Sequence, residues 1–172
     1  MDAIARLEDH QAHANRHAEY PDEAGLRAYG ALSFLYLRSG RHQNEPLKQI
    51  RRLIQPPVDL GFYKILELDG VPRAAVLWAF LNPETEHDLV HHGRILPKSW
   101  LSGDRMWIVE IIAPYNQQLG ATAMNWLRRA VPEDVKRVRY MRTTPGRQNR
   151  IVEVSRGPGA IRGAKVISPA DL

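Results

Sequence analysis

The hydrophobic pattern has its strongest feature between residues 102 and 115. An apolar run over residues 106–112 contains one carboxylate, Glu110, and lies between the polar turn Ser102-Gly103-Asp104 and Ala113-Pro114. Such a run is typical of a strand that is buried on both faces, and strands of this kind tend to be central in a sheet. Burial raises the energy of an ionised carboxylate, so Glu110 needs a partner or a proton.

Two helices are predicted in the first third of the chain. Asp22 can cap a helix over residues 23–38, where apolar side chains form a broad face. This helix ends in a polar turn, residues 39–44, that carries one histidine. Pro46 then begins a short helix, which we expect Pro56-Pro57 to stop because proline has no backbone N–H group.

The middle of the chain predicts a hairpin followed by a helix. Residues 62–68 and 71–80 are expected to form two strands, joined by a turn at Asp69-Gly70. Asn82-Pro83 begins a helix that ends near His91-His92.

After Pro114 the pattern changes to a polar, glycine-containing loop over residues 116–122 and an apolar helix that reaches Ala130. A strand, a loop of this kind and a helix together present free backbone N–H groups to an anion. Further strands are predicted over residues 135–141 and 150–154. The second of these is expected to be the last strand, and the glycine- and proline-containing tail from Gly157 is expected to be loose.

These elements predict an α+β fold with a mixed, largely antiparallel central sheet of four or five strands, flanked by helices. The length of 172 residues is typical of one domain with small appendages. We expect a polar N-terminal extension over residues 1–21, the domain itself over residues 22–156 and a C-terminal tail over residues 157–172.

Composition excludes several kinds of site. The chain has no cysteine, which excludes disulfides, a thiolate nucleophile and a cysteine-rich zinc site, and fits a cytoplasmic protein. No secretory signal and no membrane span is expected, because the N-terminus is polar and no apolar run is long enough. The net charge of +5 favours acidic partners, or serves only solubility.

Three histidines, His10, His13 and His17, would share one face of an N-terminal helix. Histidines at this spacing can hold a metal ion. A solvated, partly frayed helix explains them better, so no metal site is predicted.

Three blocks of residues follow one another in an order that is typical of one known family. In the first, Gly30 to Pro46, the apolar end of a helix precedes Ser39 and His42. The second holds Gly70 and Pro72 before an apolar run that ends in Trp78-Ala79. The third, Trp100 to Tyr115, combines S-G-D-R-x-W, an apolar strand and I-A-P-Y. On these blocks, which span most of residues 30–156, the chain resembles the toxin-activating lysine acyltransferases.

This resemblance implies a fold and an activity. Members of the family have a divergent Gcn5-related N-acetyltransferase fold, and attach fatty acyl groups to internal lysines of repeat-in-toxin proteins. Their donor is acyl carrier protein, whose phosphopantetheine arm carries the acyl group, so no permanently bound cofactor is implied. The implied partners are acyl carrier protein, a repeat-in-toxin-type substrate and a second copy of the chain in a homodimer.

The resemblance also implies a catalytic pair, His42 and Glu110. The family has aspartate at the place of Glu110 and arginine at the place of Gln43, and these departures leave room for another protein substrate. Acyl transfer to lysine requires a base, because free lysine has a pKa of about 10.4. Imidazole is suited to this task, either as the base or as a transient nucleophile that becomes an acyl-imidazole.

The other implied site residues have structural alternatives. Glu110 would orient the imidazole and stabilise its cation, or it forms a structural ion pair with an arginine. His42 alone reads as a helix C-terminal residue that interacts with the helix dipole. Ser39 supports the site or caps the turn, and Asp104 and Arg105 support the site or brace the turn before the strand.

Donor binding is expected at Asn116, Gln117, Gly120 and Arg128. The loop from Gln117 approaches the acetyltransferase pattern Q-x-x-G-x-[GA] but has Thr122 in its last position. A basic cluster of Lys48, Arg51 and Arg52 would meet the acidic carrier protein, or is only a solvated face. Two other functions stay open: an acetyl-coenzyme A-dependent N-acetyltransferase, and a basic nucleic-acid-binding module that uses the arginines of residues 137–142.

Overall fold

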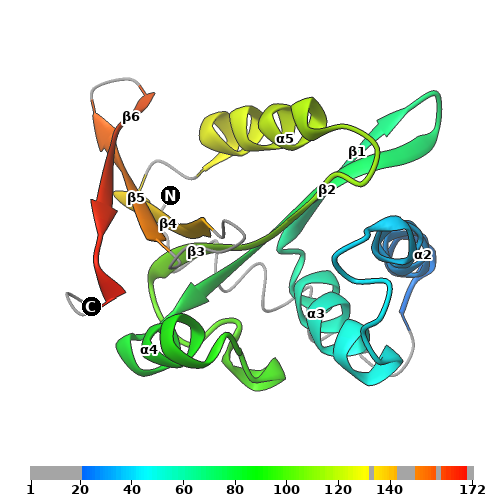
Figure 1. Ribbon diagram of the computed structural model, residues 1–172, viewed down its shortest axis with the longest axis horizontal. Coiled ribbons are helices and arrows are strands. Elements are labelled where there is room, and N and C mark those ends of the chain that lie inside the picture. Colours follow the sequence, from blue (N-terminus) through cyan, green and yellow to red (C-terminus); the bar gives the residue numbers. More distant parts are fainter. Residues whose placement is uncertain (1–20, 132–133, 143–149, 158–159, 170–172) are drawn as a thin grey trace. The chain divides into compact units, whose positions relative to one another are not determined.

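The computed structural model describes residues 21–131, 134–142, 150–157 and 160–169. Six strands follow one another in the sheet order β1-β2-β3-β4-β5-β6 (Figure 1). The pair β3–β4 is parallel, whereas β1–β2, β4–β5 and β5–β6 are antiparallel. The predicted α+β class with a mixed, largely antiparallel sheet is therefore confirmed, and the arrangement is consistent with an acetyltransferase-like fold. Among the described residues, no helix combines the length and apolar character needed to cross a membrane.

The chain divides into two compact units. The first contains residues 1–77 and 110–127, and the second contains residues 78–109 and 128–172. Two strands pass from one unit to the other, β2 (Val71–Leu81) and β3 (Arg105–Ile112). Each unit is described by itself below.

In the first unit, helix α2 (Glu23–Arg38) begins where the sequence predicts. The carboxylate of Asp22 accepts a hydrogen bond from the backbone N–H of Gly25 at 2.8 Å, which satisfies one of the unpaired groups of the first turn. The buried face of α2 carries Leu32, Leu35 and Tyr36, none of which is exposed. α2 packs beside α3 (Leu47–Leu60) (Figure 1).

Helix α3 corrects one prediction, because Pro56-Pro57 does not stop it. Both prolines lie inside the helix and are buried, together with Val58. Each proline removes a hydrogen-bond donor, at a cost of about 3 kcal/mol in a helix interior. Burial of these three consecutive apolar residues offsets that cost, and the helix continues to Leu60. Gly61 has a φ of 69°, a left-handed conformation that ends helices.

The predicted hairpin is present as β1 (Tyr63–Leu68) and the first part of β2. At the turn, Asp69 has a φ of 54° and Gly70 a φ of 72°. Positive φ at both central residues is the requirement of the two-residue turn that matches strand twist. The unit is completed by most of α5 (Gln117–Ala130), which buries Ala123 and Leu127.

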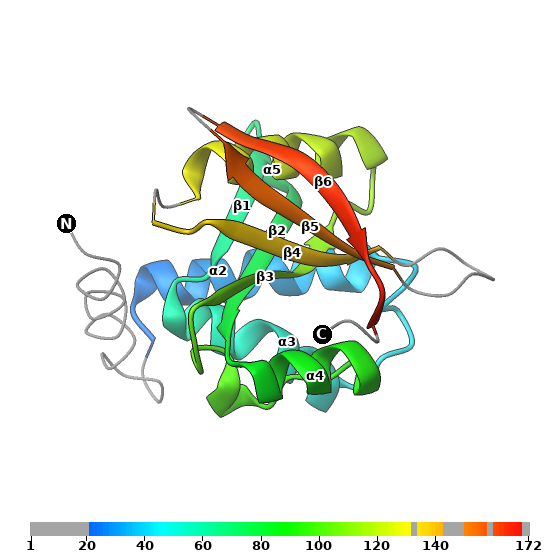
Figure 2. The same cartoon turned by 90° about the vertical axis from the view of Figure 1, so that its left-hand side faces the viewer.

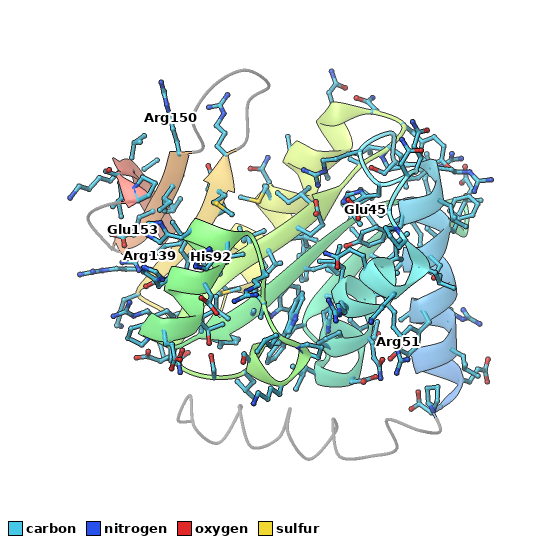
Figure 3. The ribbon with its side chains drawn as sticks, turned by 60° about the horizontal axis from the view of Figure 1, so that its bottom comes forward. Glu45, Arg51, His92, Arg139, Arg150 and Glu153 are labelled. Carbon is cyan, nitrogen blue, oxygen red and sulfur yellow. The ribbon has the colours of Figure 1, made fainter. Side chains whose placement is uncertain are left out.

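The second unit contains α4 (Pro83–His92), the short helix η1 (Pro97–Ser99), β4 (Arg137–Arg142), β5 (Arg150–Gly157) and β6 (Ala160–Ile167). The strands β4, β5 and β6 lie side by side, with β6 at the edge of the sheet (Figure 2). Figure 3 marks Arg139 on β4 and Glu153 on β5, and Arg139 Nη2 lies 2.7 Å from Glu153 Oε2.

β6 was not predicted, and residues 150–154 are not the last strand. The tail from Gly157 was expected to be loose because it is rich in glycine and its apolar and polar residues do not alternate strongly. Its backbone pairs antiparallel with β5, from Ile151↔Ile167 to Gly157↔Ala160. Pairing with a neighbouring strand supplies hydrogen bonds that the local sequence does not signal.

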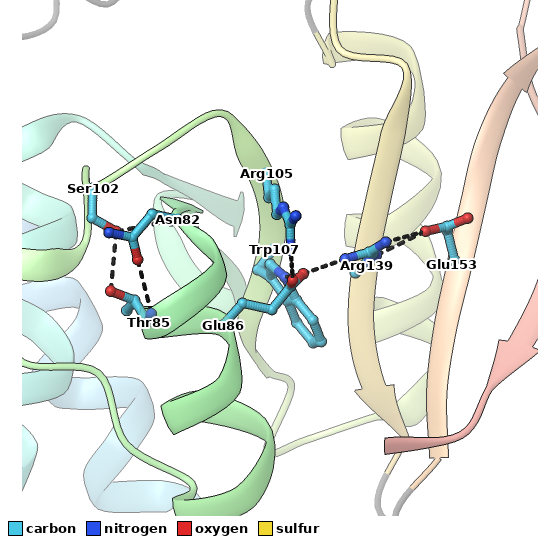
Figure 4. Close-up of polar contacts among 8 residues, drawn as sticks. All are labelled: Asn82, Thr85, Glu86, Ser102, Arg105, Trp107, Arg139 and Glu153. Atoms are coloured by element: carbon cyan, nitrogen blue, oxygen red, sulfur yellow. Dashed lines mark hydrogen bonds and ion pairs between the residues drawn. The ribbon is translucent and has the colours of Figure 1, made fainter. Parts of the chain in front are cut away.

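The S-G-D-R-x-W block forms the frame of the second unit. Ser102 Oγ accepts a hydrogen bond from the Asn82 backbone N–H at 3.0 Å and lies 3.2 Å from Thr85 Oγ1 (Figure 4). Gly103 packs so closely on the backbone that a Cβ atom would lie 2.6 Å from Leu81 O. The block thus fastens the start of α4 to the segment that leads into β3.

Glu86 is the buried centre of this frame, with 1% of its surface exposed. Its carboxylate pairs with the guanidinium groups of Arg105 and Arg139, and accepts a hydrogen bond from Trp107 Nε1 at 2.7 Å (Figure 4). A buried carboxylate requires such partners because water no longer solvates it. The arginine and tryptophan of S-G-D-R-x-W are therefore ligands of a buried charge.

We expect the substitution Glu86→Gln to lower the free energy of unfolding by about 3 kcal/mol, because Arg105 loses its buried counter-charge and Arg139 keeps only Glu153. Urea unfolding followed by tryptophan fluorescence measures this loss. Glu84→Gln on the same helix is the matched control, since Glu84 is exposed, and should change stability by less than about 0.5 kcal/mol. Equal effects of the two substitutions would contradict a central role for Glu86.

Candidate active site

The candidate site lies in the first unit, at the turn that follows α2. Ser39 ends the helix, and its backbone carbonyl accepts a hydrogen bond from the His42 N–H at 2.8 Å. The His42 carbonyl in turn accepts from the Glu45 N–H at 3.0 Å. This compact turn holds the imidazole against Tyr36, with 4.7 Å between ring centroids in an edge-on arrangement. His42 is consequently buried, at 6% exposure.

The two ring nitrogens of His42 have different neighbours. Nδ1 lies 3.0 Å from Ser39 Oγ, and Nε2 lies 3.4 Å from Glu110 Oε2. Glu110 comes from the end of β3 that belongs to the same unit. The structure therefore brings together three residues that the sequence singled out, and it does so across a separation of about 70 positions in the chain.

Arg41 is a member of this cluster that the sequence did not indicate. Its guanidinium forms an ion pair with Glu110 Oε1, the oxygen that also accepts a hydrogen bond from the Ile111 backbone N–H at 3.0 Å. The Arg41 side chain is 56% exposed, whereas that of Glu110 is 12% exposed. The available signal was that the resemblance leads us to expect an arginine at position 43, whereas this chain has an arginine two positions earlier. Spacing alone does not show which side chain reaches Glu110.

The surroundings keep His42 neutral at physiological pH. Burial lowers the pKa of His42 because it penalises the imidazolium form, and the positive charge of Arg41 lowers it further, to about 4. A neutral imidazole has one free lone pair, which both a base and a nucleophile require. The nearby Tyr36 stays protonated, since burial raises the pKa of its phenol. Its buried hydroxyl has no hydrogen-bond partner within the described part of the chain.

The other predicted residues lie elsewhere or have other contacts. Arg105 belongs to the second unit, where it pairs with Glu86, and Asp104 is exposed. Asn116 Oδ1 accepts a hydrogen bond from the Gln118 backbone N–H at 2.8 Å, so it caps α5. Gly120 has ordinary contacts, because an added Cβ would lie 3.6 Å from Ala113 and Ile111.

Some predictions fall outside the described residues. These are the side chains of Gln117 and Arg128 and the N-terminal histidines His10, His13 and His17.

The fold is α+β with a mixed sheet, and the site contains a buried, neutral histidine beside a carboxylate. Such a site is suited to proton transfer or acyl transfer. The sequence profile of the RTX toxin acyltransferase family matches residues 22–155. This match covers most of the chain, and the protein belongs to that family.

Three relatives illustrate the similarity. The protein-lysine myristoyltransferase RtxC of Kingella kingae is 37% identical over 87 residues, which are 50% of this chain and 52% of the relative. The protein-lysine palmitoyltransferase CyaC of Bordetella bronchiseptica is 31% identical over 111 residues, 64% of this chain and 60% of the relative. The protein-lysine myristoyltransferase HlyC of Escherichia coli is 27% identical over 113 residues, 65% of each. The chain thus spans about half to two thirds of the length of these relatives.

We expect Arg41→Gln to raise the pKa of His42 above about 4, because a positive charge next to the imidazolium is removed and Glu110 is left free to pair with it. The pKa should stay below the ordinary value of about 6.5, since burial persists. Titration of the histidine Cε1–H resonances by NMR measures the shift.

Arg38→Gln is the matched control for this experiment. It removes the same charge three residues earlier, where the guanidinium lies 3.7 Å from the centroid of the Phe34 ring. Its effect on the His42 pKa should be small. A His42 pKa that is unchanged or lower in Arg41→Gln would show that the charge of Arg41 does not lower this pKa.

Proposed function

We propose that this protein is a lysine acyltransferase that moves a fatty acyl group from acyl carrier protein to an internal lysine of an RTX-type protein. The observation that carries the proposal is the buried, neutral His42, placed between Ser39 Oγ and the carboxylate of Glu110 in a member of the RTX toxin acyltransferase family. The relatives named as protein-lysine myristoyl- and palmitoyltransferases support the lysine acceptor and the fatty acyl group.

In the direct route, the lysine amine attacks the thioester carbonyl while His42 accepts the amine proton. The C–S bond then breaks, the phosphopantetheine thiolate leaves and takes that proton, and an amide and a thiol are the products. Imidazolium forms transiently, and Glu110 stabilises it across the 3.4 Å separation from Nε2. Proton transfer is then left to Nδ1, with the Ser39 hydroxyl as its immediate neighbour at 3.0 Å.

In the second route, His42 itself attacks the thioester and the thiolate leaves with the carrier protein. The lysine amine then attacks the acyl-imidazole, the bond from the acyl carbon to the imidazole nitrogen breaks, and the released amine proton neutralises the thiolate, which leaves an amide, a thiol and a neutral imidazole. Both routes require the imidazole to be neutral before it reacts, which agrees with the low pKa of His42.

The acidic donor is expected to meet helix α3. The side chains of Leu47, Lys48, Arg51 and Arg52 are all exposed on it, so an apolar group lies next to three positive charges. Figure 3 shows Arg51 on this helix. Charge complementarity steers association and fixes orientation. The first unit contains both α3 and His42.

The N-terminus of α5 favours a carrier protein over free coenzyme A. The first backbone N–H groups would have to hold the pyrophosphate of coenzyme A. The N–H groups of Gln118 and Leu119 already donate to the side chain and the carbonyl of Asn116, at 2.8 and 3.1 Å. A phosphopantetheine arm makes no such demand on these groups.

We expect the protein to acylate an RTX-type fragment when it is incubated with acyl-loaded carrier protein, with the modified lysine identified by mass spectrometry. His42→Ala should lower the rate by at least about 100-fold, which is the lower range for removal of a general base. His91→Ala is the control, because His91 is exposed and lies in the second unit. No acylation by the unmodified protein, or equal rates with His42→Ala, would refute the proposal.

We expect Arg51→Glu to raise the KM for acyl carrier protein by roughly tenfold with little change in kcat, because it places a negative charge opposite an acidic partner. The increase should shrink as salt is added. Lys98→Glu makes the same change of charge at an exposed residue of the second unit and serves as the control. Equal KM values for the two variants would remove α3 from the docking surface.

A further inference from the structure

Helix α4 carries, from its middle to its C-terminal end, a cluster of metal-ligating side chains that the proposed reaction does not use. Three of its residues, His87, Asp88 and His92, offer ligand atoms that all lie within 4.8 Å of one another. His92 Nε2 and Asp88 Oδ1 are 3.9 Å apart. Both histidines are exposed, so the ligand atoms are accessible from solvent.

Helix geometry explains one pair within this cluster. Residues that are four apart lie on one face of a helix, which pairs Asp88 with His92. His87, one residue before Asp88, lies about 100° further round the helix, and the conformation of its side chain brings its ligand atom within 4.8 Å of the other two. The ring of His91 packs on that of His87, with 4.2 Å between centroids, and so borders the cluster.

The backbone beneath the cluster is held in place from the other side of the helix. Thr85, Glu86 and Leu89 are buried, and Glu86 is fixed by its arginine and tryptophan partners. The ligands therefore project from a helix that is already anchored, and only exposed side-chain torsions need to adjust. Preorganisation of this kind lowers the cost of binding.

We propose that His87, Asp88 and His92 form a surface site for one divalent transition-metal ion of the zinc class. Two imidazoles and a carboxylate are ligands that Zn²⁺, Co²⁺ and Ni²⁺ accept, with bonds of about 2.0–2.2 Å for zinc. Ligand atoms bound to one such ion lie about 3.3 Å apart, so rotation of the exposed imidazoles closes the present separations. Water completes the coordination shell.

The position of the cluster near the end of α4 favours a cation, and the types of its ligands define the kind of ion. The carbonyl groups at the C-terminal end of α4 carry partial negative charge, and the cluster lies next to that end. Calcium and magnesium prefer oxygen ligands, so two imidazoles select against them. His92 is marked on α4 in Figure 3.

The test is a titration of the full-length, tag-free, metal-free protein with Co²⁺, followed by visible absorption, and with Zn²⁺, followed by calorimetry. We expect one ion per chain at micromolar concentration, and a rise in the melting temperature with Zn²⁺. His87→Ala and His92→Ala should each weaken binding by roughly tenfold or more, and Asp88→Asn by a smaller factor. The melting temperature of each variant without metal shows whether it is folded.

Two control variants make the assignment specific. His91→Ala should change the affinity by less than about threefold. A variant with His10, His13 and His17 all replaced by glutamine should bind as the unmodified protein does. The proposal is overturned by the absence of Co²⁺ binding at about 1 mM metal, by loss of binding in either control, or by full binding in His87→Ala and His92→Ala. None of these outcomes bears on the acyltransferase activity, which is tested separately.

Discussion

The site depends on how one half-buried carboxylate, Glu110, is neutralised. Its two oxygens face two different cationic or potentially cationic groups, the exposed Arg41 and the buried His42. Arg41 carries a permanent charge and holds one oxygen firmly, together with the Ile111 N–H. The imidazole consequently does not have to be charged to compensate Glu110, and burial then favours its neutral form. Because Arg41 compensates Glu110, His42 stays neutral, which is the form that both a base and a nucleophile require.

The two ends of β3 have separate roles. At its start, Arg105 and Trp107 bind the buried Glu86 and hold α4, which is a structural task in the second unit. At its end, Glu110 reaches His42 in the first unit. The block that carries the family resemblance most visibly is thus largely a frame. Its conspicuous polar residues satisfy a buried charge, and the carboxylate of the site is the less conspicuous residue inside the apolar run.

The structure shows what surrounds the two positions at which the resemblance leads us to expect another residue. Glutamate has one more methylene than aspartate, yet its carboxylate still comes within 3.4 Å of His42 and pairs with Arg41 at the same time. Position 43, where the resemblance leads us to expect an arginine, holds the exposed Gln43. In this chain a positive charge enters the site from the position before the histidine.

The sequence alone determined the elements whose signals are local. The Asp22 cap, the Asp69-Gly70 turn and the start of α4 at Asn82-Pro83 each depend on a few neighbouring residues, and each is where the pattern predicts it. The candidate pair His42 and Glu110 came from resemblance to a family. Tertiary structure decided the continuation of α3 through Pro56-Pro57, the pairing of β6 with β5, and the contacts of Arg41 and Glu86. Each of these features depends on residues that are distant in the sequence and come together only in the fold. Their burial and charge determine how stable each contact is, and a local sequence pattern does not show this.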